Sequence, residues 1–156
     1  MAINTSKVIV GGLIAGVVAN VIDFAVNGFL LADMQKAALD ALNPTLAANA
    51  MQPSKVPIFV ALDFIMGIAN VWIYAAIRPR FGPGARTAAY AGIASWVVGS
   101  VVAGYFAGLG MFSWGVYAAA AVCALINSVV STIVGAKFYA EESAAQGAVG
   151  QTAYSA

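Results

Sequence analysis

The chain has 156 residues, of which 62% are hydrophobic and only 8% are charged, with a net charge of +1. A soluble domain carries roughly 25% charged residues, so this chain has too few charges to cover a water-exposed surface and is expected to face lipid. The balanced charge gives no electrostatic basis for binding nucleic acid, and the absence of histidine excludes His-ligated haem or zinc and the Ser-His and Cys-His catalytic pairs.

Four apolar runs follow one another along the chain, and each has about the 20 residues that a helix needs to cross a ~30 Å hydrocarbon core. They cover residues 8–32, 56–77, 87–108 and 114–136. The alternating segments of about ten residues that build a membrane barrel are absent from the sequence. The sequence therefore predicts an all-α fold: one transmembrane domain over residues 1–140, arranged as an up-down four-helix bundle, and a flexible tail at 141–156.

The connector after the first run predicts helical structure at the membrane surface. Its apolar residues recur at helical spacing, at Leu31, Met34, Ala38 and Leu42. An amphipathic helix over residues 33–42 is therefore expected to lie near the membrane interface. Asn43 and Pro44 then favour a break, with Asn43 as a cap and Pro44 at the first position of a new helix.

The other two connectors are short, and their charges predict the orientation. Residues 78–86 predict a turn rich in glycine and proline, and residues 109–113 predict a tight uncharged hairpin. Short cytoplasmic loops carry an excess of lysine and arginine. Five basic residues fall on the side of the termini and the second connector, namely Lys7, Arg78, Arg80, Arg86 and Lys137. Only Lys36 and Lys55 fall on the other side, so both termini are expected inside. Trp114 and Tyr117, near an outer helix end, are expected in an interfacial aromatic belt.

Two acids, Asp23 and Asp63, lie inside the apolar runs. A charged side chain at mid-membrane costs at least ~2.5–3.5 kcal/mol, so such residues usually face protein or a water-filled cavity. The two acids are on consecutive helices that would run antiparallel, so we expect their carboxyl groups to meet and to share one proton near neutral pH. Two interpretations stay open: a functional proton or cation site, or a hydrogen bond that only locks two helices.

Three asparagines, Asn20, Asn70 and Asn127, fall at similar depths, roughly 18–20 Å from the predicted outer helix ends at 1.5 Å per residue. We expect them to form a polar layer below the acids. Small residues form stripes along the helices, and we expect the Gly12 and Gly16 face of the first helix to be buried. The stripe on the third helix is Ser95, Gly99, Ala103 and Ala107, and the stripe on the fourth is Ala120, Ala124, Asn127, Ser131 and Gly135. Such faces are more often the small-residue and hydrogen-bonding contacts of membrane helices than a binding site.

The stretch around the first acid, continued by residues 33–42, resembles small four-helix inner-membrane proteins of bacteria that are classed as domains of unknown function. It reads Asn20-Val21-Ile22-Asp23-Phe24-Ala25-Val26-Asn27-Gly28. In that group the first helix also runs into an amphipathic segment, and a short basic turn joins helices two and three. The resemblance implies an integral protein of the bacterial inner (plasma) membrane, but no substrate, because these families have no assigned activity.

No enzymatic motif is present. Intramembrane aspartyl proteases carry Gly-x-Gly-Asp, whereas Asp23 and Asp63 stand in Ile-Asp-Phe and Leu-Asp-Phe, and the sequence has no phosphate loop, nucleotide fingerprint or metal cluster. We therefore expect a membrane protein without catalytic activity, cofactor or metal, either an accessory or structural subunit or a small permease. The alternative is a proton- or cation-coupled transporter that uses Asp23 and Asp63. Besides the lipid bilayer, the partners left open are a second copy of the chain or a larger membrane complex.

Overall fold

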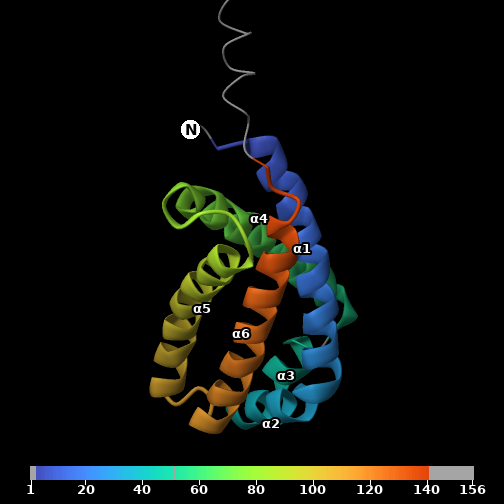
Figure 1. The fold of residues 1–156 in the computed structure, drawn as a ribbon. Coiled ribbons are helices and arrows are strands. Elements are labelled where there is room, and N and C mark those ends of the chain that lie inside the picture. The colour runs from blue at the N-terminus through green and yellow to red at the C-terminus, as the bar shows by residue number, and fades with distance from the viewer. Residues whose placement is uncertain (1–2, 51, 141–156) are drawn as a thin grey trace, which may run out of the picture.

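The computed structural model describes residues 3–50 and 52–140, and every regular element in them is helical (Figure 1). The main helices are α1 (Thr5–Ala25), α2 (Ala32–Leu42), α3 (Pro44–Ala50), α4 (Val56–Phe81), α5 (Ala85–Gly108) and α6 (Trp114–Ala136). A five-residue π-helix, η1 (Val26–Leu30), joins α1 to α2, and a 3-10 turn, η2 (Pro53–Lys55), precedes α4. The all-helical prediction is confirmed, and the tail predicted at 141–156 lies outside the described residues.

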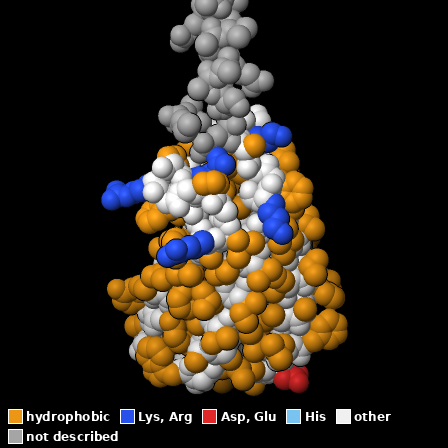
Figure 2. Space-filling model, viewed as in Figure 1, with side chains coloured by type: hydrophobic (Ala, Val, Ile, Leu, Met, Phe, Trp, Pro, Cys, Tyr) orange, Lys and Arg blue, Asp and Glu red, His pale blue; other side chains and the backbone are white. Residues whose placement is uncertain are grey.

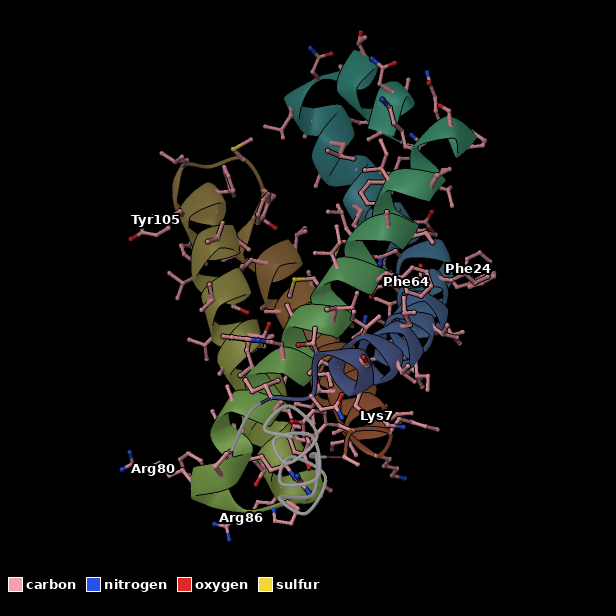
Figure 3. The ribbon with its side chains drawn as sticks, turned by 90° about the horizontal axis from the view of Figure 1, so that it is seen from above. Lys7, Phe24, Phe64, Arg80, Arg86 and Tyr105 are labelled. Carbon is pink, nitrogen blue, oxygen red and sulfur yellow. The ribbon has the colours of Figure 1, made fainter. Side chains whose placement is uncertain are left out.

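Four helical segments in the described part of the chain are long and apolar enough to cross a membrane. They are Thr5–Leu30, Pro53–Phe81, Ala85–Gly108 and Trp114–Ala136. Even the shortest, with 23 residues, is about 34 Å long at 1.5 Å per residue. Bulky apolar side chains cover the outside (Figure 2), and Figure 3 shows Phe24 and Tyr105 pointing away from the bundle on opposite sides. A surface of this kind suits lipid rather than water.

Glycines allow α1 and α4 to approach closely. A Cβ atom added to Gly16 would lie 2.8 Å from the Cα of Phe64, and one added to Gly67 would lie 2.6 Å from the backbone nitrogen of Gly16. Gly12 meets the backbone of Ile68 in the same way. Without side chains at these positions the two backbones pack directly, as membrane helices commonly do. The predicted burial of the Gly12 and Gly16 face is confirmed.

The tightly packed core lies towards the end of the bundle that holds the α4–α5 turn. There Gly11 on α1 faces Gly135 on α6, and Gly92 on α5 faces the Ser128 carbonyl on α6. Around these contacts lie the buried residues Val8, Ala15, Val71, Ala75, Ala88 and Ala91. The stretch of α5 beyond Gly92 is mostly exposed or half-buried, so the helices pack less closely in the other half of the bundle.

The turn predicted at residues 78–86 is shorter than expected. Helix α4 continues through Pro79 to Phe81, so that only residues 82–84 connect it to α5. Proline removes one backbone hydrogen bond, which a helix tolerates near its end, and the Gly82 amide still donates to the Arg78 carbonyl at 2.8 Å. Gly82 and Gly84 have φ angles of 82° and 121°, and this left-handed backbone favours glycine at both positions.

The connector between α1 and α4 folds into the predicted surface helices. Helix α2 begins at Ala32 and ends at Leu42, and the Asn43 side chain accepts a hydrogen bond of 2.8 Å from the Thr45 amide at the start of α3. In Figure 1 α2 and α3 lie across the end of the bundle opposite the N-terminus. They therefore cover the half of the bundle in which the long helices are less tightly packed.

Candidate functional site

A cavity of about 560 Å³ lies between the long helices, in the loosely packed half of the bundle. Its wall combines residues of α1, α4, α5 and α6, and Gln35, Ala38 and Leu39 of α2 complete it. Small-molecule sites in proteins typically measure ≈ 300–1,000 Å³, so this cavity has room for a ligand and not only for a water molecule.

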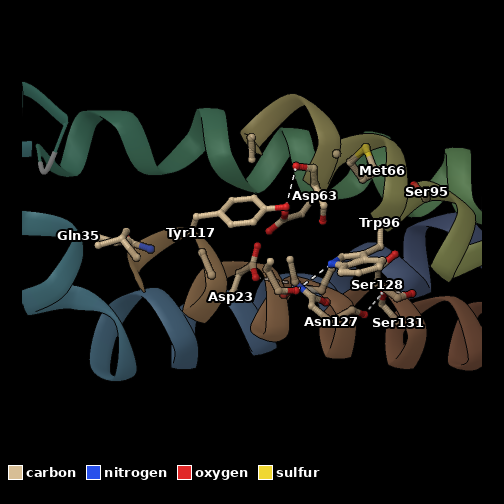
Figure 4. Close-up of a pocket in the computed structure, with 18 of the residues that line it drawn as sticks. Asp23, Gln35, Asp63, Met66, Ser95, Trp96, Tyr117, Asn127, Ser128 and Ser131 are labelled. Carbon is tan, nitrogen blue, oxygen red and sulfur yellow. Dashed lines mark hydrogen bonds between the residues drawn. The ribbon is translucent and has the colours of Figure 1, made fainter. Parts of the chain in front are cut away.

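Asp23 and Asp63 both line this cavity, Asp23 from α1 and Asp63 from α4 (Figure 4). Figure 4 shows the two carboxyl groups near each other on this wall. Both residues are half-buried. The Asp23 Oδ1 atom also accepts a hydrogen bond of 2.6 Å from Nδ2 of Asn127. The structure thus brings together the two acids that the sequence places on consecutive helices.

Asn127 and Asn70 line the cavity beside the acids, and both are more than nine-tenths buried, with 9% and 3% of their surface exposed. The Asn127 amide donates to the Ala19 carbonyl as well as to Asp23, which fixes its nitrogen on that side. Asn70 donates to the Ser128 hydroxyl at 3.5 Å, and that hydroxyl in turn donates to the Gly92 carbonyl at 2.9 Å.

These hydrogen bonds leave two buried acceptors without a partner. Because the amide nitrogens of Asn70 and Asn127 face acceptors, their Oδ1 atoms point elsewhere, and neither accepts a hydrogen bond from a described residue. A buried polar atom without a hydrogen bond costs about 1–3 kcal/mol, so folded proteins rarely retain one. Both oxygen atoms have almost no accessible surface, so they lie within the packed protein behind the cavity wall and do not face the open space.

Asn20 does not belong to this group. It donates to the Gly16 carbonyl on its own helix and, at 3.4 Å, to the Val60 carbonyl on α4, and it is not among the residues that line the cavity. The polar layer expected from equal depth is therefore divided: Asn70 and Asn127 face the cavity, and Asn20 bridges α1 and α4. Depth along a helix does not specify rotation about its axis.

Sequence reasoning missed the two aromatic residues of the wall, Trp96 and Tyr117. The Trp96 indole donates to the Ala121 carbonyl at 2.8 Å, and the Tyr117 hydroxyl donates to the Ser100 carbonyl at 3.2 Å, so both rings are held in place. Tyr117 was expected in the interfacial belt, but it stands one turn before Ala120, at the start of the polar stripe of α6. Extending that stripe by three residues would have found it.

The stripe of small residues on α5 also has a different role from the close packing expected of it. Ser95, Gly99 and Ala103 line the cavity, and a Cβ added to Gly99 would meet no atom within 4 Å. These small side chains leave space open instead of admitting a neighbouring helix.

The cavity wall is acidic. Among the described residues that line it, the only charged side chains are those of Asp23 and Asp63, and none is a lysine or arginine. The described residues hold no group of three or more Asp, Glu, Cys or His side chains that could bind a metal ion. This arrangement suits a proton or a cation more than an anion or a transition metal.

Comparison with known proteins gives no relative: no family model matches the chain, and neither does a curated protein or a solved structure. The membership expected from the architectural resemblance therefore stays a prediction.

Proposed function

We propose that this protein is a small membrane permease without catalytic activity, in which Asp23 and Asp63 couple transport to the movement of a proton or cation. The observation that carries the proposal is that the two acids of the membrane spans share one cavity wall. The chain would cross a bacterial inner membrane four times in up-down fashion, with both termini in the cytoplasm.

The energetic cost of the acid pair favours a functional role over a purely structural one. Two unit charges 4 Å apart repel by roughly 4 kcal/mol at an effective dielectric constant of 20. A hydrogen bond between neutral groups, such as that from the Asn127 amide to the Ala19 carbonyl, also joins two helices and carries no such repulsion. The acid pair is therefore tolerated when it holds a proton or a cation, and a permease uses the exchange between the two.

The charge distribution supports the proposed orientation. The lysine and arginine side chains visible in Figure 2 gather at one end of the molecule, the end that holds the α4–α5 turn. Arg80 and Arg86 project from that turn in Figure 3. The positive-inside rule places this end in the cytoplasm, so the cavity would lie in the outer half of the membrane.

Flux measurements in liposomes test the proposal. We expect liposomes that contain the protein and a trapped pH dye to change their internal pH more than protein-free liposomes do when a cation gradient is imposed, with Na⁺, K⁺ and a small organic ammonium ion tested in turn. Asp23→Asn and Asp63→Asn should each reduce this change to the level of protein-free liposomes. The control is Asp33→Asn, since Asp33 is an exposed acid on α2, outside the cavity wall, and this variant should retain the flux.

The opposite result would identify a structural pair. If the unaltered protein gives no flux with any of these cation gradients, and the two variants only lower its thermal stability in detergent, the proposed permease function is wrong and the protein is better described as an accessory or structural subunit.

A further inference from the structure

The hydrogen-bonding groups of the cavity wall are unequally divided between donors and acceptors. The side-chain donors of Asn70, Trp96, Tyr117, Asn127, Ser128 and Ser131 are all engaged with acceptors of the protein. The Ser95 and Ser100 hydroxyls make no hydrogen bond to a described residue and can either donate or accept, whereas the carboxyl groups of Asp23 and Asp63 add acceptor oxygens and negative charge to the wall. A ligand that pairs with these carboxyl groups brings N–H or O–H donors, and their negative charge favours a ligand with positive charge.

The size and lining of the cavity favour an organic ligand over an inorganic ion alone. Polar atoms gather where Asp23, Asp63 and Asn127 meet, whereas much of the wall is formed by apolar side chains such as Met66 and Val116. A monovalent metal ion would occupy a small part of about 560 Å³ and leave the apolar wall against water. An organic cation would fill the charged and the apolar parts together.

Two aromatic rings are in position to contact such a cation. Figure 4 shows the Tyr117 ring beside the two acids and the Trp96 ring further along the same wall. Ring faces attract ammonium groups, most strongly when the site is removed from water. They also pack against the apolar body of a ligand.

From these observations we propose, building on the permease function above, that the cavity binds a primary or secondary ammonium compound with an apolar or aromatic body. The ammonium group donates hydrogen bonds to Asp23 and Asp63, and the body lies along Met66 and the two aromatic rings.

Binding exchanges one positive charge for another. The titratable groups on the wall are Asp23 from α1, Asp63 from α4 and the phenol of Tyr117 from α6, and the wall residues of α2 and α5 include none. An acid pair that holds one proton releases this proton when an ammonium ion binds in its place. The net charge of the site is then the same before and after binding. Each bound ammonium therefore frees about one proton.

A single-tryptophan variant makes binding visible. The chain has three tryptophans, so Trp72→Phe with Trp114→Phe leaves Trp96 on the cavity wall as the only one. In detergent, 2-phenylethylamine should shift the emission of Trp96 saturably and acidify a weakly buffered solution. The neutral analogue 2-phenylethanol should bind about tenfold or more weakly and release no proton, because it lacks the charge-assisted hydrogen bonds. Asp23→Asn with Asp63→Asn should remove the preference for the amine, and Asp33→Asn should keep it.

Three results would each overturn the ligand class. The first is equal binding of the amine and the alcohol to the unaltered protein, which needs no variant to fold. The second is the same emission shift and proton release with NaCl alone. The third is amine binding that survives in a folded double acid variant.

The permease function and the ligand class can fail separately. Amine binding with proton release, but without flux in liposomes, would retain the site and reject transport. Flux that depends on the acids, without amine binding, would retain transport and reject the ammonium ligand.

Discussion

The side chain of Asn127 connects the acid pair to the rest of the bundle. It reaches from α6 to α1 and donates to both the Asp23 carboxyl and the Ala19 carbonyl. An amide at this position therefore supports an acid that would otherwise face an apolar surrounding. Interhelical hydrogen bonds of this kind contribute ≈ 0.6 kcal/mol on average in membrane proteins and up to ≈ 1.7 kcal/mol.

Replacing Asn127 by leucine should lower the free energy of unfolding in detergent by about 1–2 kcal/mol. The variant loses the hydrogen bonds to the Ala19 carbonyl and to the Asp23 carboxyl, and Asp23 keeps no amide partner. The control is Ile126→Leu, since Ile126 is 54% exposed on the adjacent helix position and its replacement should be nearly neutral. The unfolding temperature of each variant gives the comparison. In an Asp23→Asn background the effect of Asn127→Leu should become smaller, and an unchanged effect would mean that the two side chains are not coupled.

At the scale of the helices, glycines have two different purposes in this bundle. Those at the α1–α4 contact admit a neighbouring backbone, whereas Gly99 on α5 borders open space in the cavity. Replacing a glycine by leucine should therefore destabilise the protein at the α1–α4 contact but not at Gly99.

Gly16→Leu should destabilise the protein by about 1–3 kcal/mol, because its side chain would meet the backbone and ring of Phe64. The measurement is thermal unfolding in detergent. Val17→Leu is the matched control on the next residue, which is 54% exposed and faces away from α4. Similar losses in both variants would show that the α1–α4 contact is placed wrongly.

Gly99→Leu should have the opposite effect: the protein should stay stable, but its transport activity should fall. Leucine favours a helix over glycine by about 0.5–1 kcal/mol, and the position has space, so the unfolding temperature should stay the same or rise. The new side chain occupies the cavity, so the flux proposed above should fall. A variant that is unfolded, or one that is folded and fully active, would each contradict this placement of Gly99.

For the molecule as a whole, exposure and charge point to a lipid-surrounded bundle with one basic end. The exposed side chains include Phe29, Leu30, Tyr105 and Leu109, each more than two-thirds exposed. The two halves differ in packing: small residues close the basic half, and the other half holds the cavity under α2.

The orientation can be measured by labelling cysteines in a Cys123→Ala background, which removes the native thiol. Ser54→Cys before α4 and Ala85→Cys at the start of α5 should react from opposite sides of the membrane, with residue 85 inside. Ala85 is preferred to Gly84, whose positive φ would strain any side chain. Equal labelling of both positions from both sides would mean dual insertion and would contradict the proposed topology.

The sequence by itself determined the helical fold. Length and hydropathy predicted four apolar helices, three of them ending within a few residues of the observed positions, since a chain in lipid must satisfy its backbone hydrogen bonds internally. It also placed Asp23 and Asp63 on consecutive helices, because an acid in an apolar run is conspicuous. The extension of α4 through Pro79 was missed, since a proline signals a helix end only statistically.

Only the tertiary structure decided which side chains share the cavity. It separated Asn20 from Asn70 and Asn127, and it moved Tyr117 from the expected interface to the wall beside the acids. Periodicity shows which residues lie on one face of a helix, and counting shows their depth. Neither specifies which neighbour that face meets, because this depends on how helices rotate and tilt to bring their small residues together.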